Sequence, residues 1–166
     1  MRSGISTARL SIGAVSLAAA LLASGCGSAA TTGTSSAPAG PSVTVLAGPA
    51  TGVGTVLVTS KGYTLYMFVP DKHRAVTCTG ICATHWPPLR LPSGDALVAG
   101  PGVKSSLLGS DPDPAGGRVV TYNGWPLYTY ASDIQSGMAT GQGLDLNGGK
   151  WYVMRTSGSP LISSGP

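Results

Sequence analysis

Six side chains able to bind metals or take part in redox chemistry crowd between positions 67 and 85 of this chain. They are two cysteines, both histidines of the chain, a methionine and an aspartate: Cys78, Cys82, His73, His85, Met67 and Asp71. Soft sulfur together with imidazole suits copper(I) or zinc, so a copper-binding or thiol-redox site is one interpretation of this segment. The haem-attachment pattern is excluded, because no histidine directly follows Cys82.

The N-terminus has the layout of a secretory signal peptide. Arg2 and Arg9 precede an apolar stretch at 10–23, which is shorter than the roughly 18 residues that a spanning helix needs. The small residues before Cys26 resemble a bacterial lipobox, in which the cysteine is lipidated and the signal peptide, here 1–25, is removed. We therefore expect export, with the mature chain anchored to the outer face of a membrane through acyl chains on Cys26.

A structural disulfide is the second interpretation of the cysteine-rich segment. Two cysteines, Cys78 and Cys82, remain when the lipidated Cys26 is set aside. An even number of cysteines in an oxidising compartment favours a disulfide. A disulfide tolerates about 4.4 to 6.8 Å between alpha carbons, whereas four extended residues span roughly 13 Å. The segment is then expected to be a turn, and no cofactor is expected.

A ten-residue motif occurs twice in the chain. Residues 62–71 and 124–133 both read Gly-aromatic-x-Leu-Tyr-x-aromatic-x-x-Asp, at a constant offset of 62. Each copy follows a β-branched run, at 55–59 and 118–122, and a turn sequence, so each is predicted to form a β-hairpin. Such self-similarity indicates a duplicated supersecondary unit.

A third strand is predicted at 151–154 in the second copy, after the Asn-Gly-Gly turn at 147–149. Its counterpart at 86–89 contains two prolines and is expected to be an edge strand or a loop. The proline-rich segment 90–117 is interpreted as a long connection with at most one helical turn, around 105–108.

The motif places two aromatic side chains on one face of each predicted strand, because side chains alternate along a strand. Its aromatic and acidic residues are Tyr66, Phe68, Asp71, Tyr128, Tyr130 and Asp133. One interpretation is a duplicated aromatic core, in which the aspartates cap a loop or accept a hydrogen bond from a tyrosine hydroxyl. The other is an exposed stacking platform with an acid at its end, as in glycan-binding sites.

Composition favours a mainly β protein and gives little support to an enzyme. All six acidic residues are Asp, and 25 Gly with 13 Pro leave few helix formers. Removal of Arg2 and Arg9 leaves eight Lys and Arg against six Asp, which implies no nucleic-acid partner. Neither a Gly-x-Ser-x-Gly elbow nor a His-Glu-x-x-His motif is present, and Asp111 and Asp113 are expected to form turns.

These observations predict a single small β domain built from two hairpin or meander units with long loops. A flexible linker rich in Ala, Ser, Thr, Gly and Pro is expected to follow the lipidated cysteine. The expected boundaries are a signal peptide at 1–25, the lipidated cysteine and linker at 26–51, the domain at 52–155 with repeats at about 53–91 and 116–155, and a flexible tail at 156–166.

The combined motifs resemble the bacterial secreted-repeat lipoproteins of unknown function. The resemblance rests on the lipobox, the doubled Tyr-x-aromatic-x-x-Asp, the Cys-x-Gly-x-Cys before Trp86, and the closing Gly-Gly-Lys-Trp-Tyr-Val. It implies an envelope lipoprotein with the six motif residues as its signature and nothing catalytic. We therefore expect a lipid-anchored, non-enzymatic module whose partners are the membrane and an unidentified envelope ligand or protein.

Overall fold

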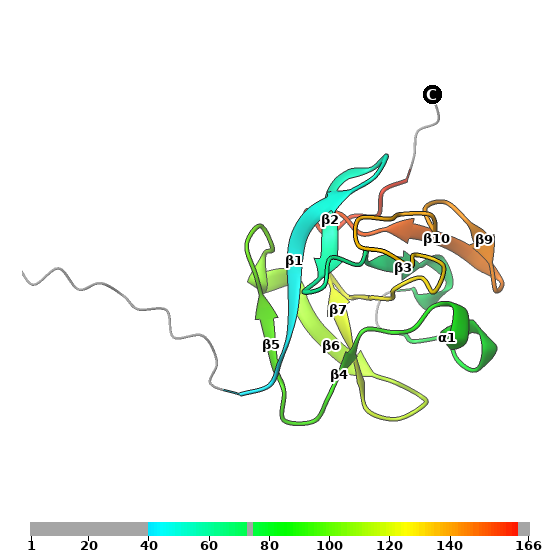
Figure 1. The fold of residues 1–166 in the computed structure, drawn as a ribbon. Coiled ribbons are helices and arrows are strands. Elements are labelled where there is room, and N and C mark those ends of the chain that lie inside the picture. Colours follow the sequence, from blue (N-terminus) through cyan, green and yellow to red (C-terminus); the bar gives the residue numbers. More distant parts are fainter. Residues whose placement is uncertain (1–39, 73–74, 163–166) are drawn as a thin grey trace, which may run out of the picture. The chain divides into compact units, whose positions relative to one another are not determined.

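Within residues 40–72 and 75–162, which the computed structural model describes, ten strands form three small sheets (Figure 1). The first sheet has the order β2-β1-β5, from Gly54–Thr59, Ser42–Ala50 and Ala96–Ala99. The second has the order β3-β10-β9, from Tyr66–Phe68, Gly149–Val153 and Asp145–Leu146. The third has the order β4-β7-β6, from Arg90–Leu91, Arg118–Tyr122 and Leu108–Pro112, with β8, Trp125–Pro126, also paired to β7.

Helical structure in the described residues is short. It comprises α1 at Ile81–His85 and two 3-10 turns, η1 at Val69–Asp71 and η2 at Ser105–Leu107. The turn η2 is the helical turn predicted in the connection. The mainly β class and the single small domain are confirmed. In the described part of the chain, no helix is long and apolar enough to cross a membrane.

Strand β1 corrects the predicted boundary of the linker. Residues 42–50 were assigned to a flexible linker, but they form the central strand of the first sheet, antiparallel to β2 and parallel to β5. Val45 is fully buried, and a side chain on Gly48 would lie 2.7 Å from a methyl of Val58. The Ala, Gly and Pro content that suggested a linker instead permits close packing of strands.

The predicted hairpin is confirmed in the second copy, where Asn123 and Gly124 join β7 to β8 with positive φ values of 50° and 77°. Two successive positive φ values are typical of a type I′ turn. In the first copy the hairpin is short. It consists of the bridge between Val58 and Thr64 and a hydrogen bond from the Leu65 amide to the Leu57 carbonyl, after which β3 pairs with β10 instead of β2.

Alternation along the motif strands divides the core into two clusters, and the aromatic residues of each motif share one side, as predicted. We call the first the aromatic cluster; its buried members include Tyr66, Phe68, Cys78, Trp86, Tyr128 and Trp151. We call the second the aliphatic cluster; its buried members are Val45, Leu57, Leu65, Met67, Val120, Tyr122, Leu127 and Met154. Successive residues of β3 thus contribute to opposite sides of the same sheet.

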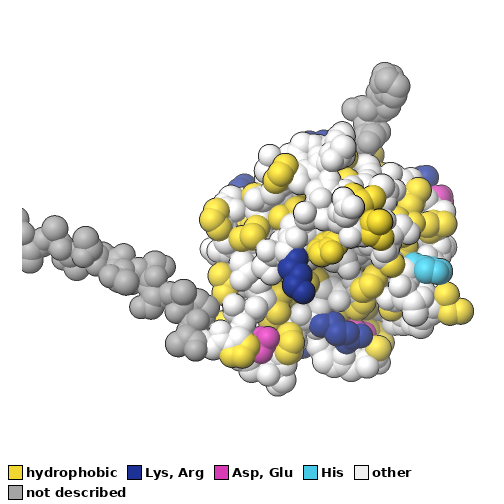
Figure 2. Space-filling model, in the orientation of Figure 1, with side chains coloured by type: hydrophobic (Ala, Val, Ile, Leu, Met, Phe, Trp, Pro, Cys, Tyr) yellow, Lys and Arg dark blue, Asp and Glu magenta, His cyan; other side chains and the backbone are white. Residues whose placement is uncertain are grey.

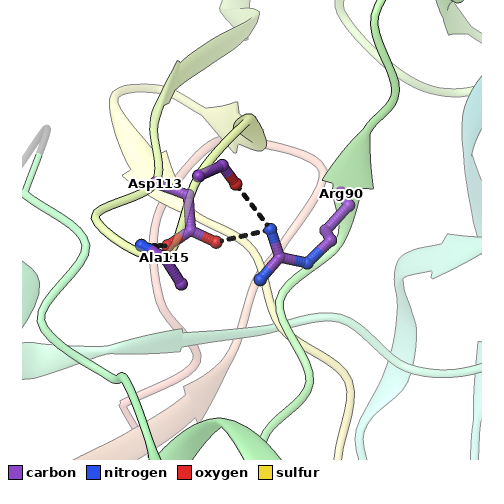
Figure 3. Close-up of polar contacts among 4 residues, drawn as sticks. Arg90, Asp113 and Ala115 are labelled. Atoms are coloured by element: carbon purple, nitrogen blue, oxygen red, sulfur yellow. Dashed lines mark hydrogen bonds and ion pairs between the residues drawn. The ribbon is translucent and has the colours of Figure 1, made fainter.

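The connection at 90–117 is more regular than predicted, because it contains β4, β5 and β6. Asp111 lies in β6 and is not a turn former. Asp113 does form a turn, since its Oδ1 accepts a hydrogen bond from the Ala115 amide at 2.8 Å. Its Oδ2 lies 2.9 Å from the Arg90 guanidinium, which also donates to the Gly116 carbonyl, so β4 is tied to the β6–β7 loop (Figure 3).

The C-terminal segment corrects the prediction of a flexible tail from 156 onward. A bridge joins Met154 to Pro160, and the Leu161 amide donates to the Val153 carbonyl at 2.8 Å. Gly158 is buried, and its carbonyl accepts a hydrogen bond from the Asn123 side chain. Residues 155–162 therefore belong to the domain. Residues 163–166 lie outside the described residues.

Candidate functional site

Each motif aspartate accepts a hydrogen bond from the motif tyrosine of the other repeat. The Tyr66 hydroxyl donates to Asp133 Oδ2 at 2.5 Å, and the Tyr128 hydroxyl donates to Asp71 Oδ2 at 2.7 Å. Both tyrosines are fully buried, and the aspartates are at most 4% exposed. The interpretation as a duplicated core with hydrogen-bonded aspartates is confirmed, with the partners exchanged between copies.

The two tyrosines also pair through their backbones. The Tyr66 amide donates to the Tyr128 carbonyl at 2.8 Å, and the Tyr128 amide donates to the Tyr66 carbonyl at 2.9 Å. This exchange of both backbone bonds is typical of an antiparallel hydrogen-bonded pair. The repeats therefore meet at Tyr66 and Tyr128 in a local two-fold arrangement.

The second oxygen of each aspartate binds a threonine of its own repeat. Asp71 Oδ1 accepts from the amide and hydroxyl of Thr77 at 2.8 and 2.7 Å. Asp133 Oδ1 accepts from the amide and hydroxyl of Thr140 at 3.0 and 2.6 Å. Both carboxyl groups are thus fully engaged. These threonines were not predicted from the sequence, although they follow the aspartates at similar spacings of six and seven residues.

The surroundings shift the ionisation of these groups. Burial raises the pKa of Tyr66 and Tyr128 above the ordinary value for a phenol, and the carboxylate partner adds to the shift. Burial also raises the pKa of Asp71, although hydrogen bonds from Thr77 and Tyr128 partly oppose this effect. The environment therefore favours neutral phenols.

Four aromatic rings form a stacked column through the aromatic cluster, which we call the ring column. Phe68 stacks on Trp151 with centroids 4.2 Å apart, Trp151 on Trp86 at 3.9 Å, and Trp86 on Tyr130 at 4.1 Å. The two tryptophans come from corresponding places, after the motif strand of each repeat. The ring column therefore follows the same two-fold arrangement, with Phe68 and Tyr130 at its ends.

The two ends of the ring column differ. Phe68 is only 3% exposed, and a side chain on Gly149 would lie 3.0 Å from its ring and 2.5 Å from Pro70. That end is sealed by close packing. At the other end, Tyr130 is only partly buried, and one side of it packs on Trp86. One ring of the predicted stacking platform is therefore accessible.

Two hollows lie beside Tyr130. The first, which we call the His85 hollow, has a volume of about 320 Å³ and is lined by His85, Tyr130, Ala131, Ser132, Leu146 and Asn147. The second, which we call the Ile134 hollow, has a volume of about 380 Å³ and is lined by Tyr63, Thr129, Tyr130, Ala131, Asp133 and Ile134. Since both include Tyr130 and Ala131, the hollows adjoin at the open end of the ring column.

Main-chain hydrogen bonds join the two repeats beside Tyr130. The Ala131 amide donates to the His85 carbonyl at 2.9 Å, and the Thr129 amide donates to the Pro87 carbonyl at 2.9 Å. Thus α1 and the following loop, from the first repeat, are fixed to the motif segment of the second. Figure 2 shows yellow apolar side chains beside the histidine, which is coloured cyan.

A larger hollow, of about 440 Å³, runs along η2 and β6 and is lined by residues 106–111, 121, 123 and 124. None of the six motif residues and no aromatic ring lines it. We therefore place the candidate site at Tyr130, where the duplicated motif reaches the surface.

The predicted disulfide is present, between Cys78 and Cys82, with alpha carbons 5.2 Å apart. Gly80, with a φ of 55°, makes the expected turn before α1. Two ligands of the copper hypothesis lie in different clusters of the core. Met67 belongs to the aliphatic cluster and Cys78 to the aromatic cluster.

Of the two histidines in that hypothesis, the structure describes one. His85 lines the hollow beside Tyr130, and His73 lies outside the described residues. Among the described residues, no group of three or more His, Cys or Asp side chains is placed to hold a metal ion. The lipidation site, Cys26, also lies outside them.

The fold and the site define a β domain made by duplication of one motif. The chain belongs to the family described as a secreted repeat of unknown function, which matches residues 50–90 and 111–155. The two matched segments contain the two motif copies, so the resemblance noted from the sequence is confirmed. Comparison with curated proteins and with solved structures found no match.

Proposed function

We propose that this protein is a non-enzymatic binding module of the cell envelope, anchored by lipid on Cys26, that presents the open end of the ring column to a ligand. The observation that carries the proposal is the difference between the two ends of the column. Duplication built two equivalent ends, and packing around Gly149 seals one of them. The Tyr130 end keeps an accessible ring between two hollows.

The anchor part of the proposal rests on the N-terminal sequence. A signal peptide that ends in small residues before Cys26 is typical of a lipoprotein precursor. The domain begins with β1 at Ser42, so residues 27–41 are available to separate it from the membrane surface. With this arrangement, the domain would lie outside the membrane.

The chemistry of the hollows supports binding without catalysis. Ser132 and His85 line the same hollow, but within the described residues no hydrogen bond joins their side chains, and no carboxylate lines that hollow to orient the imidazole. In the adjoining hollow, both oxygens of Asp133 are occupied by Tyr66 and Thr140. Among the described residues, both hollows therefore lack a nucleophile paired with a base.

Two variants in the producing cell test the anchor and the binding site separately. The Cys26→Ser protein should appear in the medium, while the parent sediments with membranes. Isolated envelopes should retain the purified Cys26→Ser protein, and the added Tyr130→Ala change should abolish this retention. Membrane association of Cys26→Ser would refute the anchor, and unchanged retention of Tyr130→Ala would refute the site. Ile81→Ala is the control, because Ile81 is 75% exposed and lines neither hollow.

A further inference from the structure

We infer that the ligand of the Tyr130 site is a neutral saccharide, with one sugar ring packed against the accessible part of Tyr130. This inference rests on the proposed function and names the chemical class of its ligand.

The described residues that line the site offer no free fixed charge to a ligand. The residues that line the His85 hollow include no Asp, Glu, Lys or Arg. In the Ile134 hollow the one carboxyl group belongs to Asp133, and its hydrogen bonds to Tyr66 and Thr140 occupy both oxygens. An anionic or cationic ligand would lose its hydration without gaining an ion pair, so a neutral ligand is favoured.

The site does offer neutral hydrogen-bonding groups. The side chains of His85, Ser132 and Asn147 line one hollow, and none of the three is hydrogen-bonded to another described residue. Together they provide amide, hydroxyl and imidazole donors and acceptors. Hydroxyl groups of a sugar both donate and accept, and can therefore pair with all three.

Apolar surface lies directly beside these polar groups. Tyr130 and Leu146 line the His85 hollow, and Ile134, which is 71% exposed, lines the other. A sugar ring combines a C–H face with a rim of hydroxyl groups, so it can cover an aromatic ring while its hydroxyls reach polar side chains. A purely apolar ligand would leave the three polar side chains of the His85 hollow unpaired or would bury them at a cost.

The size and rigidity of the site favour more than one sugar unit. Hollows of about 320 and 380 Å³ adjoin along the segment 129–134. Ligand sites of roughly 300 Å³ or more enclose compact small molecules, so each hollow has room for about one ring. Asn147 is held with a φ of 56° in the β9–β10 turn, which fixes its place at the rim.

The test is a titration of the purified, detergent-solubilised lipoprotein with neutral hexasaccharides of glucose, mannose, xylose and N-acetylglucosamine. Isothermal calorimetry gives the affinity, and the fluorescence of Trp86, which stacks on Tyr130, reports occupancy of the site. At least one hexasaccharide should bind. Its affinity should fall about tenfold or more in Tyr130→Ala and change little in Tyr130→Phe, which keeps the ring.

Asn147→Gly isolates the contribution of the polar rim. Glycine retains the positive φ of the turn while it removes the amide, so weaker binding with an unchanged thermal midpoint would report a lost ligand contact. Ile81→Ala should bind like the parent. If Tyr130→Ala does not fold, the combined Ser132→Ala, Asn147→Gly variant replaces it, with the same expected loss.

The failure of this inference differs from the failure of the proposed function. Absence of binding to all four hexasaccharides, together with Tyr130-dependent binding of a planar aromatic dye or an aromatic-rich peptide, would overturn the saccharide and leave the binding module intact. Saccharide binding that is unaffected by Tyr130→Ala would also overturn the inference. If no ligand binds in a Tyr130-dependent way, and isolated envelopes do not either, both the saccharide inference and the proposed binding function are overturned.

Discussion

The Tyr66 hydroxyl of the first repeat donates a hydrogen bond to Asp133 Oδ2 of the second repeat, with the two oxygens 2.5 Å apart in the buried core. The reciprocal bond, from Tyr128 to Asp71, completes an exchange in which neither repeat supplies the tyrosine that its own aspartate binds. A buried carboxyl group without its donor is costly. Each repeat therefore depends on the other for a hydrogen bond that its own sequence motif cannot supply in this fold.

Removal of either tyrosine hydroxyl should destabilise the domain without removing its ring. Tyr66→Phe and Tyr128→Phe each leave one carboxyl oxygen without its tyrosine partner, so each should lower the free energy of unfolding by roughly 1 to 3 kcal/mol. Urea unfolding measures the change. Tyr63→Phe is the control, because Tyr63 is partly exposed and its hydroxyl makes no hydrogen bond to another described residue. Equal stability of all three variants would contradict the role of the exchanged bonds.

Alkaline pH should destabilise the domain through the same two phenols. Their pKa is raised above the ordinary value of 10.0 in the folded state, so above pH 10 the unfolded chain releases protons that the folded chain keeps. The folded state then binds more protons, and its stability falls by about 1.4 kcal/mol per pH unit for each tyrosine. Urea unfolding at several pH values measures this slope. In the Tyr128→Phe variant, the slope should be smaller by the contribution of Tyr128.

At acidic pH, Asp71 determines whether its contribution to stability rises or falls with pH. Its pKa is raised above 3.8 in the folded state, so between 3.8 and the folded value the folded chain again binds more protons. The contribution of Asp71 to stability therefore falls as the pH rises through this range. Asp71→Asn should remove this part of the pH dependence. A contribution that rises with pH there would contradict the raised pKa.

The sequence revealed the elements whose pattern is local. Alternation placed Tyr66 and Phe68 on one face of their strand, and the structure confirms this, since both belong to the aromatic cluster. The exchange of tyrosine partners could not be predicted, because two copies of one motif allow pairing within or between repeats. The ring column was likewise hidden, since its two tryptophans are 65 residues apart and meet only in the folded chain.

Strand β1 could not be predicted from the sequence for a different reason. Its Ala, Gly and Pro residues resemble those of the preceding segment, and composition gave no sign of the fully buried Val45. A chain that begins at Gly52 should therefore fail to fold, because β2 and β5 both lose their partner strand. A chain that begins at Gly40 keeps β1 and should fold like the complete mature protein. Circular dichroism and dispersion of amide proton resonances distinguish the two outcomes, and a folded Gly52 chain would refute the central role of β1.

The disulfide offers a test that also decides between the two interpretations of the cysteine-rich segment. Closure of the short loop from Cys78 to Cys82 should contribute roughly 2 kcal/mol, so the combined Cys78→Ala, Cys82→Ala variant should lose about that much stability in urea. The parent protein should lose a similar amount when it is reduced. In the reduced parent, a copper(I) titration should show no tight binding, because Cys78 is only 2% exposed and packs in the aromatic cluster. Tight copper(I) binding that disappears in the double variant would instead establish the metal-binding alternative for this segment.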